Sequence, residues 1–154
     1  MEWMIVETSV STKQYVILQL GEESYGVDIQ SVQGIEKIVT VARVPQAPAC
    51  IEGVMNLRGE IIPVMNLRKR FSLKQKEHDE DTRIIITRIE DSQVGLIVDE
   101  VNEVIELDDE EIENVQIIDN NVDLEYIAGV GKIKDGTSVV TLLDLKTLIE
   151  DTLL

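Results

Sequence analysis

Short apolar runs, separated by glycine, proline and charged residues, follow one another along the whole chain. The run YVILQL ends at Gly21 and is rich in the β-branched and aromatic residues that favour strands. A GEES turn and a second run, YGVDI, follow it, and RIIITRI and VGLIV repeat this arrangement around a turn at residues 90–92. The pattern predicts a mainly β protein built from short strands that are joined by tight turns.

Two further pairs of apolar runs predict β-hairpins. GVMNL and EIIPVMNL are joined by Arg58-Gly59, and Gly59 can take the positive φ that a tight turn demands. Pro63 has no backbone N–H to donate to a neighbouring strand, so it predicts an edge position or a bulge. The second hairpin should turn at Asp135-Gly136.

Apolar residues recur at every third position in two other segments. This spacing suggests a short helical turn in each segment before the chain extends again. The final residues predict a longer amphipathic helix with Asp144 as its candidate N-cap. The two series and the apolar stripe of the helix are Ile29, Val32, Ile35 and Ile38; Val98, Val101 and Val104; and Leu145, Leu148, Ile149 and Leu153.

The first half of the chain overlays on the second after a shift of about 69 residues. Gly26 then falls on Gly95, and the first three-residue series falls on the second. After small insertions, the hairpin glycines Gly53 and Gly59 match Gly129 and Gly136. Units of this size with several short strands close economically as small barrels, because closure removes exposed strand edges. The repeat therefore predicts two similar β-barrel lobes.

Composition and charge narrow the class of protein. The chain has 154 residues, of which 44% are hydrophobic and only 3% aromatic, so the core must consist mainly of Val, Ile and Leu. The net charge is -16, and residues 77–154 hold 22 Asp+Glu against 5 Lys+Arg. Such an acidic chain repels phosphate groups, which disfavours binding to nucleic acids or anionic membranes. The lone Cys50, the lack of a signal peptide and the lack of a long apolar run predict a soluble cytoplasmic protein.

No group of residues predicts catalysis, a metal site or a bound cofactor. The single histidine, His78, lies in a charged connector, and no phosphate-binding or dinucleotide-binding glycine motif is present. The acidic run from Glu106 to Glu113 lacks the spacing of a calcium loop and is interpreted as a solvated face. Arg58 has two interpretations: an exposed hairpin tip, or a bidentate anchor for a carboxylate across the lobes or on a partner.

The two apolar series also have two interpretations, because each could belong to the core or to a contact surface. Lobes this small have little interior, so some apolar side chains must lie in lobe–lobe or partner contacts. A duplicated, apolar protein without catalytic groups is best interpreted as one that holds other proteins together.

Four blocks of sequence resemble the bacterial chemotaxis coupling family CheW. They are YVILQLGEESYGVDIQSVQGI, VARVPQAPACIEGVMNLRGEIIPVMNLRKRF, VGLIVDEVNEVIEL and YIAGVGKIKDGTSVVTLLDLKTLI. The resemblance implies two intertwined, five-stranded SH3-like β-barrel lobes around a shared hydrophobic core, with short helices and a C-terminal helix. It places the domain at 13–150, with lobe 1 at about 13–76, lobe 2 at about 83–150, exchange of terminal segments between them, and an N-terminal extension at 1–12.

The resemblance also implies a function without catalysis or cofactors. A member of this family acts as an adaptor that joins the cytoplasmic tips of chemoreceptors to the regulatory domain of the histidine kinase CheA, at membrane-associated arrays. Gly34 departs from the family, because many members carry an acid at this position. Two alternatives are the coupling module of a larger CheV-like adaptor and a small metal-binding hydrolase. The implied receptor-binding residues are Val32, Ile35, Arg58, Val98 and Val101, and the kinase-binding residues are Ile38, Val39 and Val41.

Overall fold

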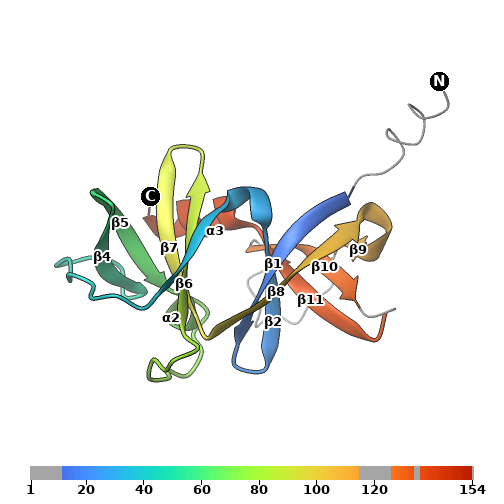
Figure 1. Ribbon diagram of the computed structural model, residues 1–154, viewed down its shortest axis with the longest axis horizontal. Helices are drawn as coiled ribbons and strands as arrows, with labels where there is room; N and C mark the ends of the chain where they lie inside the picture. Colours follow the sequence, from blue (N-terminus) through green and yellow to red (C-terminus); the bar gives the residue numbers. More distant parts are fainter. Residues whose placement is uncertain (1–11, 115–125, 134–135, 154) are drawn as a thin grey trace.

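Two β-sheets lie side by side in the computed structural model, which describes residues 12–114, 126–133 and 136–153 (Figure 1). The prediction of a mainly β fold is therefore confirmed. The first sheet has, in spatial order, β8 (Glu100–Asp108), β1 (Thr12–Leu20), β2 (Glu23–Asp28), β11 (Ser138–Leu143), β10 (Ile127–Ile133) and β9 (Ile112–Glu113). The second has β3 (Val32–Lys37), β6 (Arg83–Ile89), β7 (Ser92–Val98), β5 (Glu60–Asn66) and β4 (Ile51–Leu57).

The strand order of one sheet repeats in the other. From β8 to β10 in the first sheet, and from β3 to β4 in the second, successive pairings are antiparallel, antiparallel, parallel and antiparallel. Gly26 and Gly95 occupy equivalent central strands, and a Cβ at either would lie within 3 Å of a neighbouring side chain. The duplication predicted from the glycines is thus present in three dimensions.

Each sheet combines strands from both halves of the sequence. β1 and β2 pair with β8 and β11, whereas β6 and β7 pair with β3 and β5. The chain crosses between the sheets at the 3-10 turn η1 (Ile29–Ser31), where the Asp28 side chain accepts a hydrogen bond from the Gln30 N–H, and again at Asp99. The two sheets are therefore intertwined.

Strand pairing among the described residues does not close either sheet into a complete barrel, so this part of the fold expectation is not confirmed. The chain leaving each outer strand instead returns to the opposite edge. After β3, Ala42 forms a two-bond bridge with Val54 of β4, and after β8 the short strand β9 pairs with β10. Gly53 permits the first of these approaches, because a Cβ there would lie 2.0 Å from the Ala42 carbonyl oxygen.

Three apolar clusters stabilise this arrangement. Each sheet has one cluster formed by its own buried residues, and the third cluster joins the two sheets and the C-terminal helix α3 (Leu145–Leu153). The predicted helix cap is confirmed, since the Asp144 carboxylate accepts a hydrogen bond of 3.1 Å from the Thr147 N–H. Buried residues at the centre of the shared cluster include Leu18, Val27, Met65, Leu96, Val98 and Leu148.

The prediction of helical turns in the two three-residue series is wrong beyond residue 31. Val32 and Ile35 lie in β3, and Val101 and Val104 lie in β8. The spacing of three arises because each strand contains a β-bulge, at Gln33 in β3 and at Asn102 in β8. One extra residue in a strand turns the usual period of two into three, so both apolar residues face the same way.

The hairpin strands differ in part from the sequence expectation. β5 lies inside the second sheet, so Pro63 is not on an edge strand, but the parallel pairing with β7 begins only at Val64. The bulge in this hairpin lies in β4, between Ile51 and Gly53. In the second hairpin Asp135 lies outside the described residues, while Gly136 has the positive φ of 84° that a tight turn requires.

Candidate interaction surface

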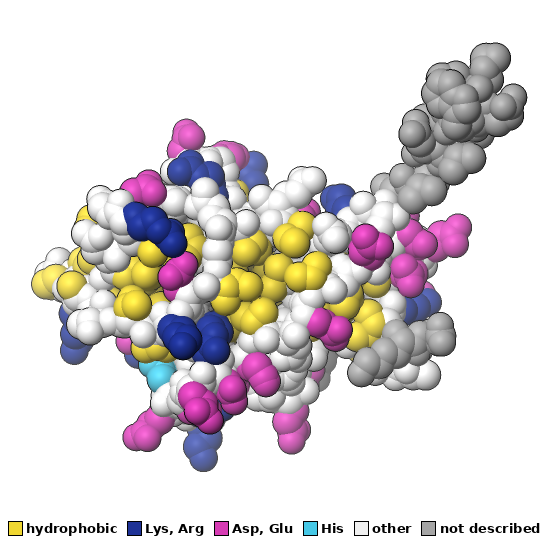
Figure 2. All heavy atoms as spheres, in the orientation of Figure 1, with side chains coloured by type: hydrophobic (Ala, Val, Ile, Leu, Met, Phe, Trp, Pro, Cys, Tyr) yellow, Lys and Arg dark blue, Asp and Glu magenta, His cyan; other side chains and the backbone are white. Residues whose placement is uncertain are grey.

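The two bulged outer strands present a matched apolar surface. Cross-strand register places Val32 and Ile35 of β3, and Val101 and Val104 of β8, on the sides of their strands that adjoin the shared cluster. Val32 and Val101 are half-buried against that cluster, whereas Ile35 and Val104 remain 43% and 49% exposed. We call these four residues the edge-strand face. Figure 2 shows hydrophobic side chains gathered over the centre of the molecule, where the outer strands run in Figure 1.

Val98 lies beneath this surface. It ends β7 and is only 1% exposed within the shared cluster. Its side chain therefore has no free surface for a partner in this structure. Of the five receptor-binding residues that the resemblance implies, Val32, Ile35 and Val101 belong to the edge-strand face, and Val98 supports it from below.

Arg58 lies apart from these residues, at the tip of the β4–β5 hairpin. It adopts a φ of 51° next to Gly59 at 90°, and the Asn56 side chain accepts a hydrogen bond of 3.0 Å from the Gly59 N–H. The Arg58 side chain is 79% exposed, and its Nη2 atom lies 4.0 Å from the Glu36 carboxylate of the same sheet. Arg58 therefore does not bridge the two sheets, and the exposed-tip interpretation describes its position.

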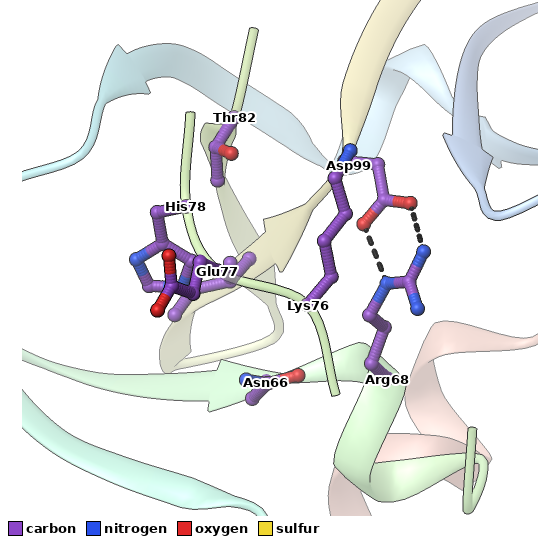
Figure 3. A pocket seen from close by; sticks show the side chains of 8 residues that line it. Asn66, Arg68, Lys76, Glu77, His78, Thr82 and Asp99 are labelled. Carbon is purple, nitrogen blue, oxygen red and sulfur yellow. Dashed lines mark hydrogen bonds and ion pairs between the residues drawn. The ribbon is translucent and has the colours of Figure 1, made fainter. Parts of the chain in front are cut away.

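The bidentate anchor between the sheets is a different arginine. Arg68 lies in α2 (Leu67–Arg70) and donates hydrogen bonds of 2.8 and 2.6 Å to the two carboxylate oxygens of Asp99, as Figure 3 shows. Asp99 also accepts a bond of 2.7 Å from the Gly21 N–H in the β1–β2 turn. These bonds fix the second crossover to both sheets.

Electrostatics at this crossover favour the charged forms. Hydrogen bonding from Arg68 holds the pKa of Asp99 below its usual value, and the bond to Asp99 raises the pKa of Arg68. Their side chains are only 13% and 15% exposed, so the pair is largely shielded from water. No local sequence motif marks this pair, because the two residues lie 31 positions apart.

The residues implied for kinase binding follow β3 and divide between core and surface. Ile38 and Val41 pack, half-buried, against the cluster inside the second sheet. Val39 lies between them and is 41% exposed. The Ala42–Val54 bridge holds the end of this segment against β4. Val39 is thus the most exposed of the three residues.

Among the described residues no buried side-chain nitrogen or oxygen atom lacks a hydrogen-bond partner. No group of three or more His, Cys, Asp or Glu in this part of the chain is placed to hold a metal ion. Cys50 is buried, and burial raises the pKa of its thiol. His78 lines a small pocket beside Arg68 and Asp99 (Figure 3).

The acidic run Glu106–Glu113 partly caps its own backbone. The Asp108 carboxylate accepts hydrogen bonds from the N–H groups of Glu110 and Glu111, and the Glu111 carboxylate accepts one from the Asp108 N–H. This capping box explains some of the acids as turn residues.

No helix in the described part of the chain is both long and apolar enough to cross a membrane.

Exposed apolar residues at duplicated positions of this two-sheet fold favour a protein that binds other proteins. The family model for the CheW-like domain matches residues 14–153, and the chain belongs to this family. It is 40% identical to "Chemotaxis protein CheW" of Treponema pallidum over 88% of this chain and 81% of that protein. It is 36% identical to the Bacillus subtilis protein of the same name, over 96% and 92% of the two chains.

A solved structure supports the same conclusion. The crystal structure of the scaffolding protein TtCheW from Thermoanaerobacter tengcongensis superposes with a TM-score of 0.83 at 38% sequence identity. The match covers 91% of this chain and 94% of that chain. The protein is therefore a non-enzymatic chemotaxis scaffold, and the resemblance recognised in the sequence is confirmed.

Proposed function

We propose that this scaffold couples the cytoplasmic tips of methyl-accepting chemoreceptors to the regulatory domain of the histidine kinase CheA. It does so by non-covalent binding in the cytoplasm, where membrane-associated receptor arrays recruit it. The observation that carries the proposal is the edge-strand face, with Ile35 and Val104 exposed at equivalent positions. An amphipathic helix can lay its apolar side on such a surface.

The receptor and the kinase engage different parts of the scaffold. The receptor tip contacts Val32, Ile35 and Val101 directly, while Val98 keeps these residues in place from the core. Arg58, with its exposed guanidinium, contributes a charge at the rim of the second sheet. The kinase contacts the segment after β3 through Val39, and Ile38 and Val41 hold that segment against the sheet.

The alternatives have less support. The module of a larger CheV-like adaptor would use the same surfaces, so it differs in chain context and not in binding chemistry. A metal-binding hydrolase needs a ligand cluster, and the described residues hold none. Neither alternative accounts better for the exposed residues of the edge-strand face.

Reconstitution of receptor, kinase and scaffold tests the proposal. Ile35→Asp places a charge on the edge-strand face, and we expect receptor-dependent kinase activity to fall about tenfold or more, because desolvating an unpaired charge opposes docking. The matched control is Val139→Asp, since Val139 is 62% exposed but lies on β11, away from this face. Normal coupling by a folded Ile35→Asp variant would contradict the proposal.

The two binding surfaces can be separated in the same system. Val39→Asp should weaken binding to the isolated CheA regulatory domain and leave binding to a receptor fragment unchanged. Ile35→Asp should do the reverse. If both substitutions weaken the same partner equally, the division into two surfaces is wrong.

A further inference from the structure

Two basic side chains lie opposite each other in the second sheet. Lys37 of β3 is directly opposite Arg83 of β6 in the antiparallel register. Such residues have Cβ atoms about 4.5–5.5 Å apart, where like charges destabilise a sheet. Arg83 donates only to backbone, through Nη1 to the carbonyl oxygens of Glu80 at 2.7 Å and Thr82 at 2.9 Å. Within the described residues neither cation forms an ion pair, although the chain has 30 Asp and Glu.

The pair lies at one end of the edge-strand face. Lys37 follows Ile35 by two residues in β3, so both side chains are on the same, exposed side of the strand. Arg83 lies between Lys37 and Val98 across the three strands. Glu36 points to the other side, where it approaches Arg58. Both basic and acidic side chains border the central hydrophobic patch on this view of the molecule (Figure 2).

The duplicated sheet shows that the fold does not require cations at this position. The 69-residue shift carries Lys37 onto Glu106 and Arg83 onto Gln14, and these two residues are also directly opposite each other, in β8 and β1. The same backbone frame therefore forms with a carboxylate and an amide at the equivalent place. The repulsion between Lys37 and Arg83 is a feature of the surface rather than a consequence of the strand pairing.

We infer that Lys37 and Arg83 form the acid-recognising end of the receptor-binding surface. A helix docked on the edge-strand face places a carboxylate side chain between the two cations, and that carboxylate relieves their repulsion. Arg83 offers a planar guanidinium and Lys37 a flexible ammonium, and both bind carboxylates through charge-assisted hydrogen bonds. The inference rests on the proposed function, and it identifies the chemistry of the partner at one defined point.

The inference predicts opposite effects on stability and on binding. Lys37→Glu replaces a repulsive cross-strand pair by an attractive one, so the denaturation midpoint of the free protein should rise. The same substitution sets a carboxylate against the partner's carboxylate. We expect its affinity for a purified cytoplasmic fragment of a methyl-accepting receptor from the same organism, measured by calorimetry, to fall about tenfold. A merely structural role for Lys37 would not move the two quantities in opposite directions.

The matched control is Lys74→Glu, which makes the same charge change at an exposed lysine in the connector after α2. It should bind the receptor fragment as the unsubstituted protein does. A receptor fragment in which the contacting acid is replaced by Lys should in turn restore binding to the Lys37→Glu variant.

The outcomes separate this inference from the proposed function. If the unsubstituted protein and Lys37→Glu bind the fragment equally well, the inference is wrong and the proposed function stands. If Lys37→Glu and Lys74→Glu weaken binding to the same extent, only long-range charge matters and the inference is again wrong. If the unsubstituted protein does not bind the fragment at all, both fail.

Discussion

The two sheets repeat one strand order, but the ion pair that follows the helix cap is different in each repeat. Arg68 lies two residues after the helix cap Asn66, and Lys146 lies two residues after the equivalent cap Asp144. Arg68 forms a shielded, bidentate pair with Asp99 beside the β1–β2 turn. Lys146 reaches Glu90 in the β6–β7 turn at 3.1 Å, with both side chains more than half exposed.

The two sheets also differ in their charge. Residues 29–98, which contain all of the second sheet, hold 10 Lys+Arg and 9 Asp+Glu. Residues 12–28 and 99–153, which contain the first sheet, hold 4 Lys+Arg and 19 Asp+Glu. A duplicated backbone thus fixes the geometry, while the side chains have diverged to give one near-neutral and one acidic lobe.

The largest difference between the repeats should appear at the equivalent glycines of the two hairpins. Gly53 has a φ of 148°, and a Cβ there would lie 2.0 Å from the Ala42 carbonyl oxygen; at Gly129 the nearest backbone atom, the Glu113 carbonyl oxygen, is 3.1 Å away. We expect Gly53→Ala to lower the free energy of unfolding by about 3 kcal/mol or more and Gly129→Ala by about 1–2 kcal/mol. Urea denaturation of both variants measures this, and equal losses would contradict the difference in packing.

The next largest difference should be between the stability costs of replacing the two carboxylates that pair with Arg68 and Lys146. Asp99→Asn leaves Arg68 without its charged partner in a shielded site, so we expect a loss of about 2–4 kcal/mol. Glu90→Gln removes the exposed counterpart and should cost less than about 0.5 kcal/mol. Guanidinium denaturation compares the two variants. If Glu90→Gln proved as costly as Asp99→Asn, the two junctions would be energetically alike despite their different exposure.

The Arg68–Asp99 pair predicts a dependence of stability on pH. The pKa of Asp99 is lowered in the folded protein by Arg68, so the unfolded state binds its proton first as the pH falls. The stabilisation is complete above the unfolded pKa, near about 4, and is lost as the pH falls through the folded value. The free energy of unfolding should therefore decline more steeply below about pH 4 in the unsubstituted protein than in Asp99→Asn. If the free energy of unfolding fell equally with pH in the two proteins, Asp99 would not contribute to the pH dependence of stability.

The smallest difference between the repeats should be at the glycines of the two hairpin turns, where the cost of substitution should be the same. Gly59 and Gly136 have φ values of 90° and 84°, and a Cβ at either position meets no atom within 4 Å. Only backbone strain opposes Gly59→Ala and Gly136→Ala, so each should cost about 1 kcal/mol. Thermal denaturation of the two variants checks this. A clear inequality would mean that the two turns are not equivalent.

Local chemistry made much of the fold predictable from the sequence. Turn glycines, β-branched runs and the Asp144 cap act within a few residues, and all of them have the predicted role. The three-residue series misled the prediction because a β-bulge and a helical turn leave the same spacing of apolar residues. Val32 and Ile35 share a side through the bulge at Gln33 and not through a helix.

Long-range pairing was beyond what sequence pattern could reveal. The Arg68–Asp99 pair and the Lys37–Arg83 pair each join residues more than 30 positions apart, and neither has a local motif. The position of Arg58 in "NLRG" drew attention to the wrong arginine for the link between the sheets. Burial of Val98 was likewise hidden, because apolar residues of a core and of a contact surface look alike in sequence.

Amide hydrogen exchange tests the central claim most directly, namely that the two bulged outer strands form one docking surface for the receptor. The protein should be measured alone and with a receptor cytoplasmic fragment. We predict slower exchange on binding in β3 and β8, and unchanged exchange in β10 and β11. Protection that appears in β10 and β11 while β3 and β8 are unchanged would contradict the account.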